Sequence, residues 1–182
     1  LGAIVVPENI THIILSPGLP LTTPEIQTAI QRGVEVIGDI ELFVRATDKP
    51  IIAITGSNGK STTTSLLGAM AAASGVVAGV GGNLGTPVLK LLDPKCTCYI
   101  LELSSFQLET TYSLHTQAAT VLNISPDHMD RYSTLADYIA AKQRIYHNAQ
   151  TLVINRDDAN TNPTAVSSAN IMGFGLEEPK LE

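Results

Sequence analysis

The sequence Ala-Ile-Thr-Gly-Ser-Asn-Gly-Lys-Ser-Thr-Thr-Thr-Ser, residues 53–65, joins an apolar strand-like run to a helix-like run. This arrangement is typical of a P-loop, in which backbone amides surround phosphate at a helix N-terminus. Lys60 would neutralise phosphate charge, and the Ser61 hydroxyl would bind Mg²⁺. The common form G-x-x-x-x-G-K-[ST] needs glycine where this chain has Ile54, so the match is to T-G-x-x-G-K-[ST]. A plain Gly/Ser turn with one solvated lysine would not account for the strand before it and the helix after it.

The composition limits the classes of protein to be considered. The chain has 182 residues, 44% of them hydrophobic, which is enough for one or two domains with a real core. A net charge of −6 and a pI near 5.1 do not suit a nucleic-acid surface, so an anionic ligand would need local positive groups. Cys96 and Cys98 are separated by one residue, which fits neither a disulfide framework nor a four-ligand zinc pattern and suggests a reducing cytosol. Residues 61–89 carry no charge but contain several glycines, so we expect buried helix, strand and loop and no membrane insertion.

Strand-like and helix-like runs alternate along the chain, which predicts an α/β fold with a mainly parallel, doubly wound sheet. A β-α-β unit at the N-terminus predicts a partial Rossmann-like piece before the P-loop. We place a domain boundary at Lys49-Pro50, giving residues 1–48 and 49–182. The expected strands are 12–16, 34–37, 51–55, 76–80, 98–104, 118–124 and 151–155, and the expected helices are 24–32, 39–47, 60–73, 87–92 and 134–148.

Polar residues that follow parallel strands are candidates for ligand binding, because ligands gather at the carboxyl ends of such strands. The loop after the strand 76–80 reads Gly81-Gly-Asn-Leu-Gly85, where Asn83 offers a donor and an acceptor. A dinucleotide fingerprint is the rival interpretation, but it would need glycine where the chain has Leu84.

Two further candidates follow later strands. Glu102 lies near the end of an apolar run, and a carboxylate there needs a cation, so we interpret it as a Mg²⁺ ligand. A paired or solvent-facing glutamate is the alternative. His128 lies in Asp127-His-Met-Asp-Arg131 and could bind metal, phosphate or carboxylate, although a single histidine is more often structural.

Lys142 is an anomaly in the helix 134–148. It falls within the apolar stripe of that helix, where an ammonium group is costly. It can snorkel to the edge of the sheet, pair with an acid, or have a pKa low enough to make its amine reactive. From the residues alone, snorkelling or pairing is the commoner outcome. The stripe consists of Leu135, Tyr138, Ile139, Ile145 and Tyr146.

Five segments in order along the chain resemble the Mur ligases of peptidoglycan synthesis. The resemblance extends upstream to Ser16-Pro-Gly18 and Gly38-Asp-Ile-Glu41, so it covers nearly the whole chain. The third segment favours the branch of the family that adds D-glutamate. The five are Thr55-Gly-Ser-Asn-Gly-Lys-Ser61, Gly81-Gly-Asn-Leu-Gly85, Glu102-Leu-Ser-Ser-Phe-Gln-Leu-Glu109, Asp127-His-Met-Asp-Arg-Tyr132 and Ala140-Ala-Lys-Gln-Arg-Ile-Tyr146.

The resemblance implies ATP-dependent amide synthesis in the cytoplasm, by a monomer that joins D-glutamate to UDP-N-acetylmuramoyl-L-alanine through an acyl phosphate. Lys60, His128 and Lys142 would be catalytic. Two Mg²⁺ ions would be held by Ser61, Glu102, His128 and Lys142. Lys142 would act as a carbamate, so the resemblance favours a reactive amine over snorkelling or pairing for this lysine. Residues expected at the ATP phosphates are Gly56, Ser57, Asn58, Gly59, Lys60, Ser61 and Thr62. Residues expected at the UDP-linked substrate are Ser16, Pro17, Gly18, Asn83 and Gln107.

The resemblance also implies that the chain holds only part of such an enzyme. Residues 1–48 would be the end of the UDP-binding domain and 49–182 part of the ATP-binding domain, without the domain that binds the amino acid. A related ligase of the folylpolyglutamate type and a non-catalytic nucleotide-binding module are the alternatives to this function. Phosphate release by the full-length protein would exclude the second.

Overall fold

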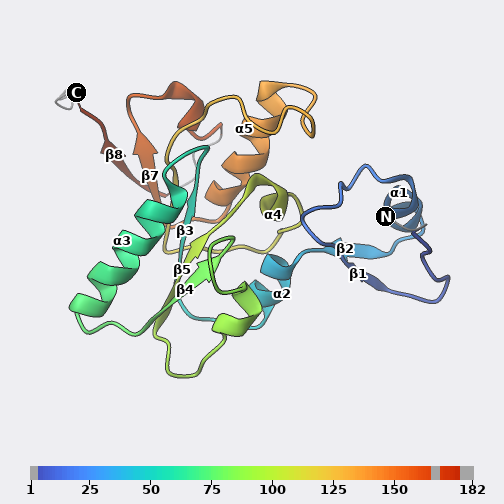
Figure 1. Ribbon diagram of the computed structural model, residues 1–182, viewed down its shortest axis with the longest axis horizontal. Helices are drawn as coiled ribbons and strands as arrows, with labels where there is room; N and C mark the ends of the chain where they lie inside the picture. The colour runs from blue at the N-terminus through green and yellow to red at the C-terminus, as the bar shows by residue number, and fades with distance from the viewer. Residues whose placement is uncertain (1–3, 165–168, 177–182) are drawn as a thin grey trace.

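A six-stranded parallel sheet forms the centre of the computed structural model, which describes residues 4–164 and 169–176 (Figure 1). The strand order is β4-β5-β3-β6-β7-β8, and every neighbouring pair is parallel. The predicted α/β class with a parallel sheet is therefore confirmed. The strands are β3 (Ile51–Thr55), β4 (Ala78–Gly82), β5 (Cys98–Glu102), β6 (Ala118–Val121), β7 (Thr151–Asn155) and β8 (Asn170–Phe174).

Helices cover both faces of this sheet (Figure 1). Helix α3 (Lys60–Ala73) packs on one face, and α2 (Asp39–Arg45), α4 (Ser105–Glu109) and α5 (Leu135–Gln143) lie on the other side. Alternate strand residues such as Ala53 and Leu101 enter the main core with Phe43 of α2. The remaining helical turns are η1 (Val88–Leu91), η2 (Arg144–Tyr146) and η3 (Ala159–Thr161).

A small β-α-β unit precedes the sheet. Strands β1 (His12–Ile14) and β2 (Glu35–Ile37) pair in parallel, and α1 (Pro24–Gln31) connects them, with proline in its first turn. The unit has its own cluster of buried side chains, Leu15, Ile26 and Val36. Helix α2 precedes Lys49-Pro50 in the sequence, yet its Ile40 and Phe43 join the core of the larger sheet. The boundary at Lys49-Pro50 stays a prediction, and the packing of α2 favours a break nearer Gly38.

Several predicted elements differ from those observed. Strand β4 begins two residues later than expected, and the helix over 134–148 is α helix only to Gln143, followed by the turn η2. Helix α4 was not predicted, because five residues are too few for a helical stripe, although Ser104 and Gln107 form a capping box. Strand β8 was not predicted either, since all of its side chains are exposed at the sheet edge. Residues 165–168 and 177–182 of the range 49–182 lie outside the described residues.

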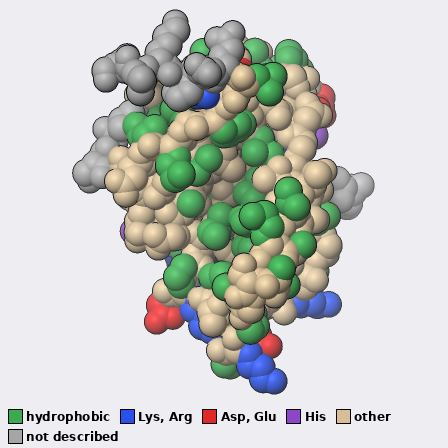
Figure 2. Space-filling model, turned by 90° about the vertical axis from the view of Figure 1, so that its left-hand side faces the viewer, with side chains coloured by type: hydrophobic (Ala, Val, Ile, Leu, Met, Phe, Trp, Pro, Cys, Tyr) green, Lys and Arg blue, Asp and Glu red, His purple; other side chains and the backbone are tan. Residues whose placement is uncertain are grey.

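The uncharged stretch 61–89 is not buried as a whole, which corrects the expectation from the sequence. Only Thr64 is buried in α3, whereas Leu66 and Met70 are 60% and 57% exposed. A helix in the outer layer of a sheet buries one side only, so its apolar outer side remains on the surface. Figure 2 shows this side of the molecule, with hydrophobic side chains across its middle. Within residues 4–164 and 169–176, no helix has the length and hydropathy needed to cross a membrane.

Candidate functional site

The P-loop lies between β3 and α3, as predicted. Gly59 precedes the helix with a φ of +81°, a conformation that favours glycine. At Gly56 the backbone passes so close to the end of the neighbouring strand β6 that a Cβ atom would lie 3.1 Å from the Cβ of Leu122. Both glycines are therefore required by the shape of the loop.

The segment after β6 forms hydrogen bonds with the P-loop. The backbone carbonyl of Asn123 accepts a hydrogen bond from the Ser57 amide, and its side-chain oxygen accepts one from the Asn58 amide, each at 2.9 Å. The Ser57 hydroxyl donates to the carbonyl of Ser125 at 3.0 Å. The sequence analysis did not identify Asn123, because the residue shows its role only through this contact between two strand ends.

The Lys60 side chain folds back onto the P-loop. Its Nζ atom donates hydrogen bonds to the carbonyl oxygens of Gly56 at 2.9 Å and of Ser57 at 3.0 Å. Ser61 and Thr62 follow in the first turn of α3 and are exposed. The cation is thus held at the helix N-terminus, where a phosphate group would bind.

Three predicted residues from three elements meet beside this loop. Glu102, at the end of β5, is only 2% exposed. Its Oε2 atom accepts a hydrogen bond from the Ser61 hydroxyl at 2.8 Å, and its Oε1 atom accepts one from the Asn83 side chain at 2.8 Å. The order β4-β5-β3 explains the meeting, because it brings the ends of these strands to one edge. Carboxylate and hydroxyl oxygens are a donor set that fits Mg²⁺.

Lys142 lies within the protein and points at the P-loop. Its side chain is 2% exposed, and Nζ donates to the Gly56 carbonyl at 2.9 Å, the same oxygen that Lys60 contacts. Burial, and after it the Lys60 charge, lower the pKa of Lys142 to about 7, against smaller opposing effects of Asp127 and Glu102. Snorkelling is therefore wrong, and within the described residues Lys142 forms no ion pair with an acid, Glu102 included; its hydrogen bond goes to a carbonyl.

His128 faces the same region from the loop after β6. Its φ of 56° is unusual for a residue other than glycine. The imidazole is 4.8 Å from the Phe106 ring and 6.4 Å from the Tyr138 ring, and its Nε2 atom lies 3.5 Å from the Asp127 carboxylate. With a side chain 47% exposed, the histidine is open to a ligand.

One cavity of about 280 Å³ brings most of these groups together. It contains the three residues predicted to be catalytic, and it opens between the small β-α-β unit and the carboxyl ends of the strands. In the described part of the chain, no three His, Cys, Asp or Glu side chains cluster as a metal site, so a cation here would also need oxygens from a ligand. The cavity is lined by Pro17, Gly18, Lys60, Asn83, Ser104, Ser105, Phe106, His128, Tyr138 and Lys142.

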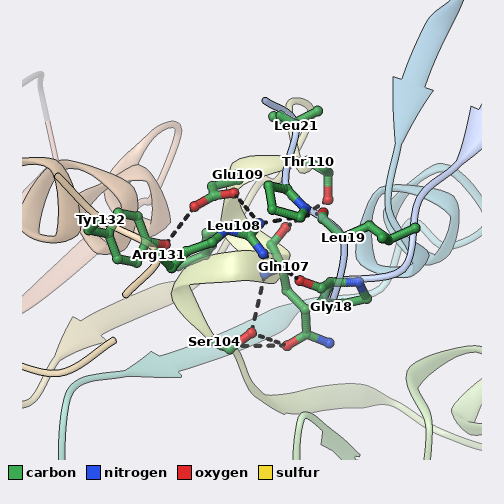
Figure 3. Close-up of polar contacts among 12 residues, drawn as sticks. Gly18, Leu19, Leu21, Ser104, Gln107, Leu108, Glu109, Thr110, Arg131 and Tyr132 are labelled. Carbon is green, nitrogen blue, oxygen red and sulfur yellow. Dashed lines mark hydrogen bonds and ion pairs between the residues drawn. The ribbon is translucent and has the colours of Figure 1, made fainter. Parts of the chain in front are cut away.

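The residues predicted to bind the UDP-linked substrate fall into two groups. Pro17, Gly18 and Asn83 line the cavity, and the Ser16 hydroxyl accepts a hydrogen bond from the Gly18 amide at 3.4 Å. Gln107 is not among the lining residues. Its side-chain oxygen accepts hydrogen bonds from the amide and hydroxyl of Ser104, at 3.1 and 3.2 Å, and so closes the cap of α4 (Figure 3). A substrate contact for Gln107 stays a prediction.

Tyr138 is a lining residue that the sequence analysis assigned to the core. Its hydroxyl lies 3.1 Å from that of Ser57, and its ring is 4.7 Å from the Nζ atom of Lys142. Its spacing of four residues from Lys142, on the same helix face, is the signal that could have revealed it.

Comparison with known proteins identifies two matching family models and many relatives. The Mur ligase middle domain matches residues 54–182, and the Mur ligase MurD-like N-terminal domain matches residues 6–38. The UDP-N-acetylmuramoylalanine--D-glutamate ligase of Haemophilus influenzae (strain PittEE) is 65% identical over 146 residues, 80% of this chain and 33% of that protein. The enzyme of the same name from Alcanivorax borkumensis is 58% identical over 164 residues, 90% of this chain and 37% of that protein. The chain spans about a third of the length of these curated relatives.

Solved structures share the fold. A UDP-N-acetylmuramoyl-L-alanyl-D-glutamate--2,6-diaminopimelate ligase superposes with a TM-score of 0.62 at 22% identity, over 93% of this chain and 45% of that one. The MurF ligase of Thermotoga maritima, solved in complex with ADP, gives a TM-score of 0.58 at 18% identity, over 82% and 43%. The model of the middle domain covers most of the residues, including the P-loop and every residue that lines the cavity except Pro17 and Gly18. The chain therefore belongs to the Mur ligase family.

Proposed function

We propose that the complete protein uses ATP to join D-glutamate to UDP-N-acetylmuramoyl-L-alanine during peptidoglycan synthesis. The observation that carries the proposal is the convergence of Lys60, His128 and Lys142 on one cavity at the carboxyl ends of the strands. The names of the relatives at 65% and 58% identity support this choice of substrates. We extend the proposal to a monomer that acts in the cytoplasm, in agreement with the family resemblance.

The reaction would have two steps. ATP first phosphorylates the terminal carboxylate of the UDP-linked substrate, giving an acyl phosphate and ADP. The D-glutamate amine then attacks the acyl carbon, and phosphate leaves as the amide forms. Such chemistry depends on positioning and charge neutralisation. Lys60, held at the N-terminus of α3, would neutralise charge on the transferred phosphoryl group.

The residues present fit the Mg²⁺ ions that the family implies. Ser61 and Glu102 would hold one ion, because their oxygen atoms already meet at 2.8 Å beside the P-loop. His128 and a modified Lys142, which both line the cavity, would hold the second. Bound Mg²⁺ would lower the negative charge on the phosphate oxygens.

Modification of Lys142 follows from its environment. A pKa of about 7 leaves much of the amine neutral at neutral pH, and only the neutral amine reacts with carbon dioxide. The nitrogen would form a bond to the carbon of carbon dioxide and lose one proton, which yields a carbamate anion. Lys142 would thereby change from a buried cation into an oxygen ligand, a form suited to a site that binds Mg²⁺.

Substitution of Lys60 in the complete protein tests the proposal. We expect Lys60→Ala to abolish formation of the acyl phosphate, measured by phosphate release and by trapping the intermediate with hydroxylamine. Lys90→Ala is the matched control, since Lys90 is an exposed lysine outside the cavity. Near-normal turnover by Lys60→Ala would exclude this role. Absence of turnover by the unmodified protein, with both substrates present, would favour a non-catalytic nucleotide-binding module instead.

A further inference from the structure

Arg131 joins the small β-α-β unit to the larger sheet unit (Figure 3). Its Nη1 atom donates a hydrogen bond to the carbonyl of Pro17 at 3.2 Å, and its Nη2 atom reaches the carbonyl of Leu19 at 3.5 Å. These partners precede it by 114 and 112 residues in the sequence. The Arg131 side chain is only 12% exposed, so the contacts are shielded from water.

Glu109 holds Arg131 from the end of α4. Its Oε2 atom accepts a hydrogen bond from Arg131 Nη2 at 2.9 Å, and its Oε1 atom accepts one from the Tyr132 hydroxyl at 2.6 Å (Figure 3). The Glu109 side chain is 18% exposed. Charge-assisted hydrogen bonds of this kind are about twice as strong as neutral ones. The carboxylate neutralises the guanidinium, so Arg131 is suited to positioning rather than to binding an anion.

The turn that carries Arg131 also carries His128. The backbone amides of Arg131 and Tyr132 donate to the carbonyl of His128, at 2.9 and 3.1 Å. The Phe106 ring contacts both side chains, with the guanidinium carbon of Arg131 4.4 Å from the ring centroid and the His128 imidazole 4.8 Å from it. A displacement of Arg131 would therefore be transmitted to His128 through both the backbone and this ring.

We propose that Arg131 is a positioning residue that fixes the Pro17–Leu19 segment at a set distance from His128. The inference rests on the proposed function, in which Pro17 and Gly18 contact the UDP-linked substrate and His128 acts at its reacting end. The guanidinium is carried by the turn of His128 and contacts the segment, so it aligns two parts of a long substrate across the cavity. ATP would bind at the P-loop, and none of the partners that Arg131 has in the described part of the chain belongs to that loop, so ATP binding would not depend on this contact.

Arg144, at the start of the turn η2 that follows α5, offers a matched control. Its guanidinium donates to the carbonyls of Leu108 at 2.7 Å and Thr111 at 2.9 Å, and it lies 5.6 Å from the Tyr112 ring. Arg144 thus repeats the chemistry of Arg131, with backbone acceptors and an aromatic ring. Both of its acceptors belong to the larger unit, so its loss should not affect the Pro17–Leu19 segment.

The experiment compares Arg131→Lys with Arg144→Lys in the complete enzyme. Lysine keeps the charge but not the fork that reaches Glu109 and the two carbonyls. For Arg131→Lys we expect the Kd for UDP-N-acetylmuramoyl-L-alanine to rise about tenfold, which corresponds to the loss of one charge-assisted hydrogen bond. The KM for ATP should change less than about twofold. For Arg144→Lys we expect both constants to change less than about twofold. Glu109→Gln, which keeps an acceptor oxygen, should weaken substrate binding in the same direction and serves if Arg131→Lys does not fold.

Hydrogen exchange provides a readout that does not depend on activity. The Leu19 amide donates to the carbonyl of Ser16 at 2.9 Å, and its exchange should be faster in Arg131→Lys but unchanged in Arg144→Lys. Equal changes in both variants, an unchanged Kd in Arg131→Lys, or an equal rise in the KM for ATP would overturn the inference. If the unmodified enzyme binds no UDP-linked substrate, the proposed function fails. In that case, hydrogen exchange at the Leu19 amide by itself tests the positioning role of Arg131. Faster exchange in Arg131→Lys supports this role, and unchanged exchange overturns it.

Discussion

Two buried ionisable side chains, Glu41 in α2 and Lys142 in α5, have opposite surroundings. Glu41 is fully buried, and its carboxylate accepts hydrogen bonds from the amides of Tyr112 and Ser113, the Ser113 hydroxyl and Arg45, at 2.7 to 3.0 Å. Lys142 is 2% exposed and donates to one carbonyl, which it shares with the ammonium of Lys60. The hydrogen-bond donors around Glu41 fully compensate its charge, whereas the charge of Lys142 is not compensated.

The pKa of each group is lowered, but the consequence differs because one is an acid and the other a base. Burial raises the pKa of Glu41, and the hydrogen bonds from Ser113, Tyr112 and Arg45 lower it by more, so the charged form is favoured. Burial and the Lys60 charge lower the pKa of Lys142 to about 7, so the neutral form is favoured. A compensated buried charge holds structure together, whereas an uncompensated one indicates a functional site.

The largest expected effect is on catalysis at Lys142. In the complete enzyme, Lys142→Ala should lower kcat by at least about a thousandfold, because the site would lose the anionic oxygen ligand that we propose. Formate or acetate should restore part of the activity by occupying the space of the proposed carbamate. Steady-state turnover with and without these salts measures both effects. Lys90→Ala should keep its activity and respond to neither salt, and full activity in Lys142→Ala would show that the buried amine has no catalytic role.

The next effect is on stability at Glu41. Glu41→Ala should lower the free energy of unfolding by about 3 kcal/mol, because two backbone amides and Arg45 lose their acceptor. The cost should decrease as the pH falls through the folded-state pKa of Glu41, since a lowered carboxyl pKa adds stability only above it. Urea unfolding at several pH values measures this. Glu25→Ala, at an exposed acid in the first turn of α1, should change stability by less than about 0.5 kcal/mol.

The sequence predicted much of the fold because its strands are nearly continuous apolar runs and its P-loop has fixed chemistry. Strand β3 and helix α3 have the predicted bounds. Lys142 could be singled out because a lysine inside a helical apolar stripe breaks a pattern. Glu41 lies in a short helix with no comparable stripe, so nothing in the sequence indicated that it is buried.

Contacts between distant segments could not be read from the sequence. Asn123 supports the P-loop across two strand ends, and Arg131 contacts carbonyl oxygens more than a hundred residues earlier in the chain. Every residue has a backbone carbonyl, so neither the spacing of residue types nor the composition of a sequence indicates which carbonyl will accept a hydrogen bond. Sequence reasoning therefore identified groups that would touch a ligand, and it missed those that position them.

The pH dependence of stability tests the lowered pKa of Lys142, the second group in the comparison with Glu41. Between pH 7 and 9 the unfolded chain keeps a proton on this lysine that the folded protein has largely released, so stability should rise with pH. Lys142→Met removes this dependence. The stability of the variant minus that of the unmodified protein should fall by about 2 kcal/mol from pH 7 to pH 9. A constant difference in urea unfolding would mean that Lys142 keeps its ordinary pKa despite its burial and the nearby Lys60 charge.

The smallest effect is expected at one donor to Glu41. Ser113→Ala removes the hydroxyl that donates to Glu41 Oε1 at 2.8 Å, but the Ser113 amide, the Tyr112 amide and Arg45 still donate. Because the charge remains compensated, the free energy of unfolding should fall by only about 1 kcal/mol.

Comparison of this variant with Glu41→Ala shows whether the compensation of Glu41 is shared among its donors. Ser133→Ala, at an exposed serine, is the control, and all three proteins are unfolded in urea at one pH. A loss in Ser113→Ala as large as that in Glu41→Ala would mean that one hydroxyl carries the whole effect. Glu41 would then resemble Lys142, whose amine donates its hydrogen bond to one carbonyl oxygen.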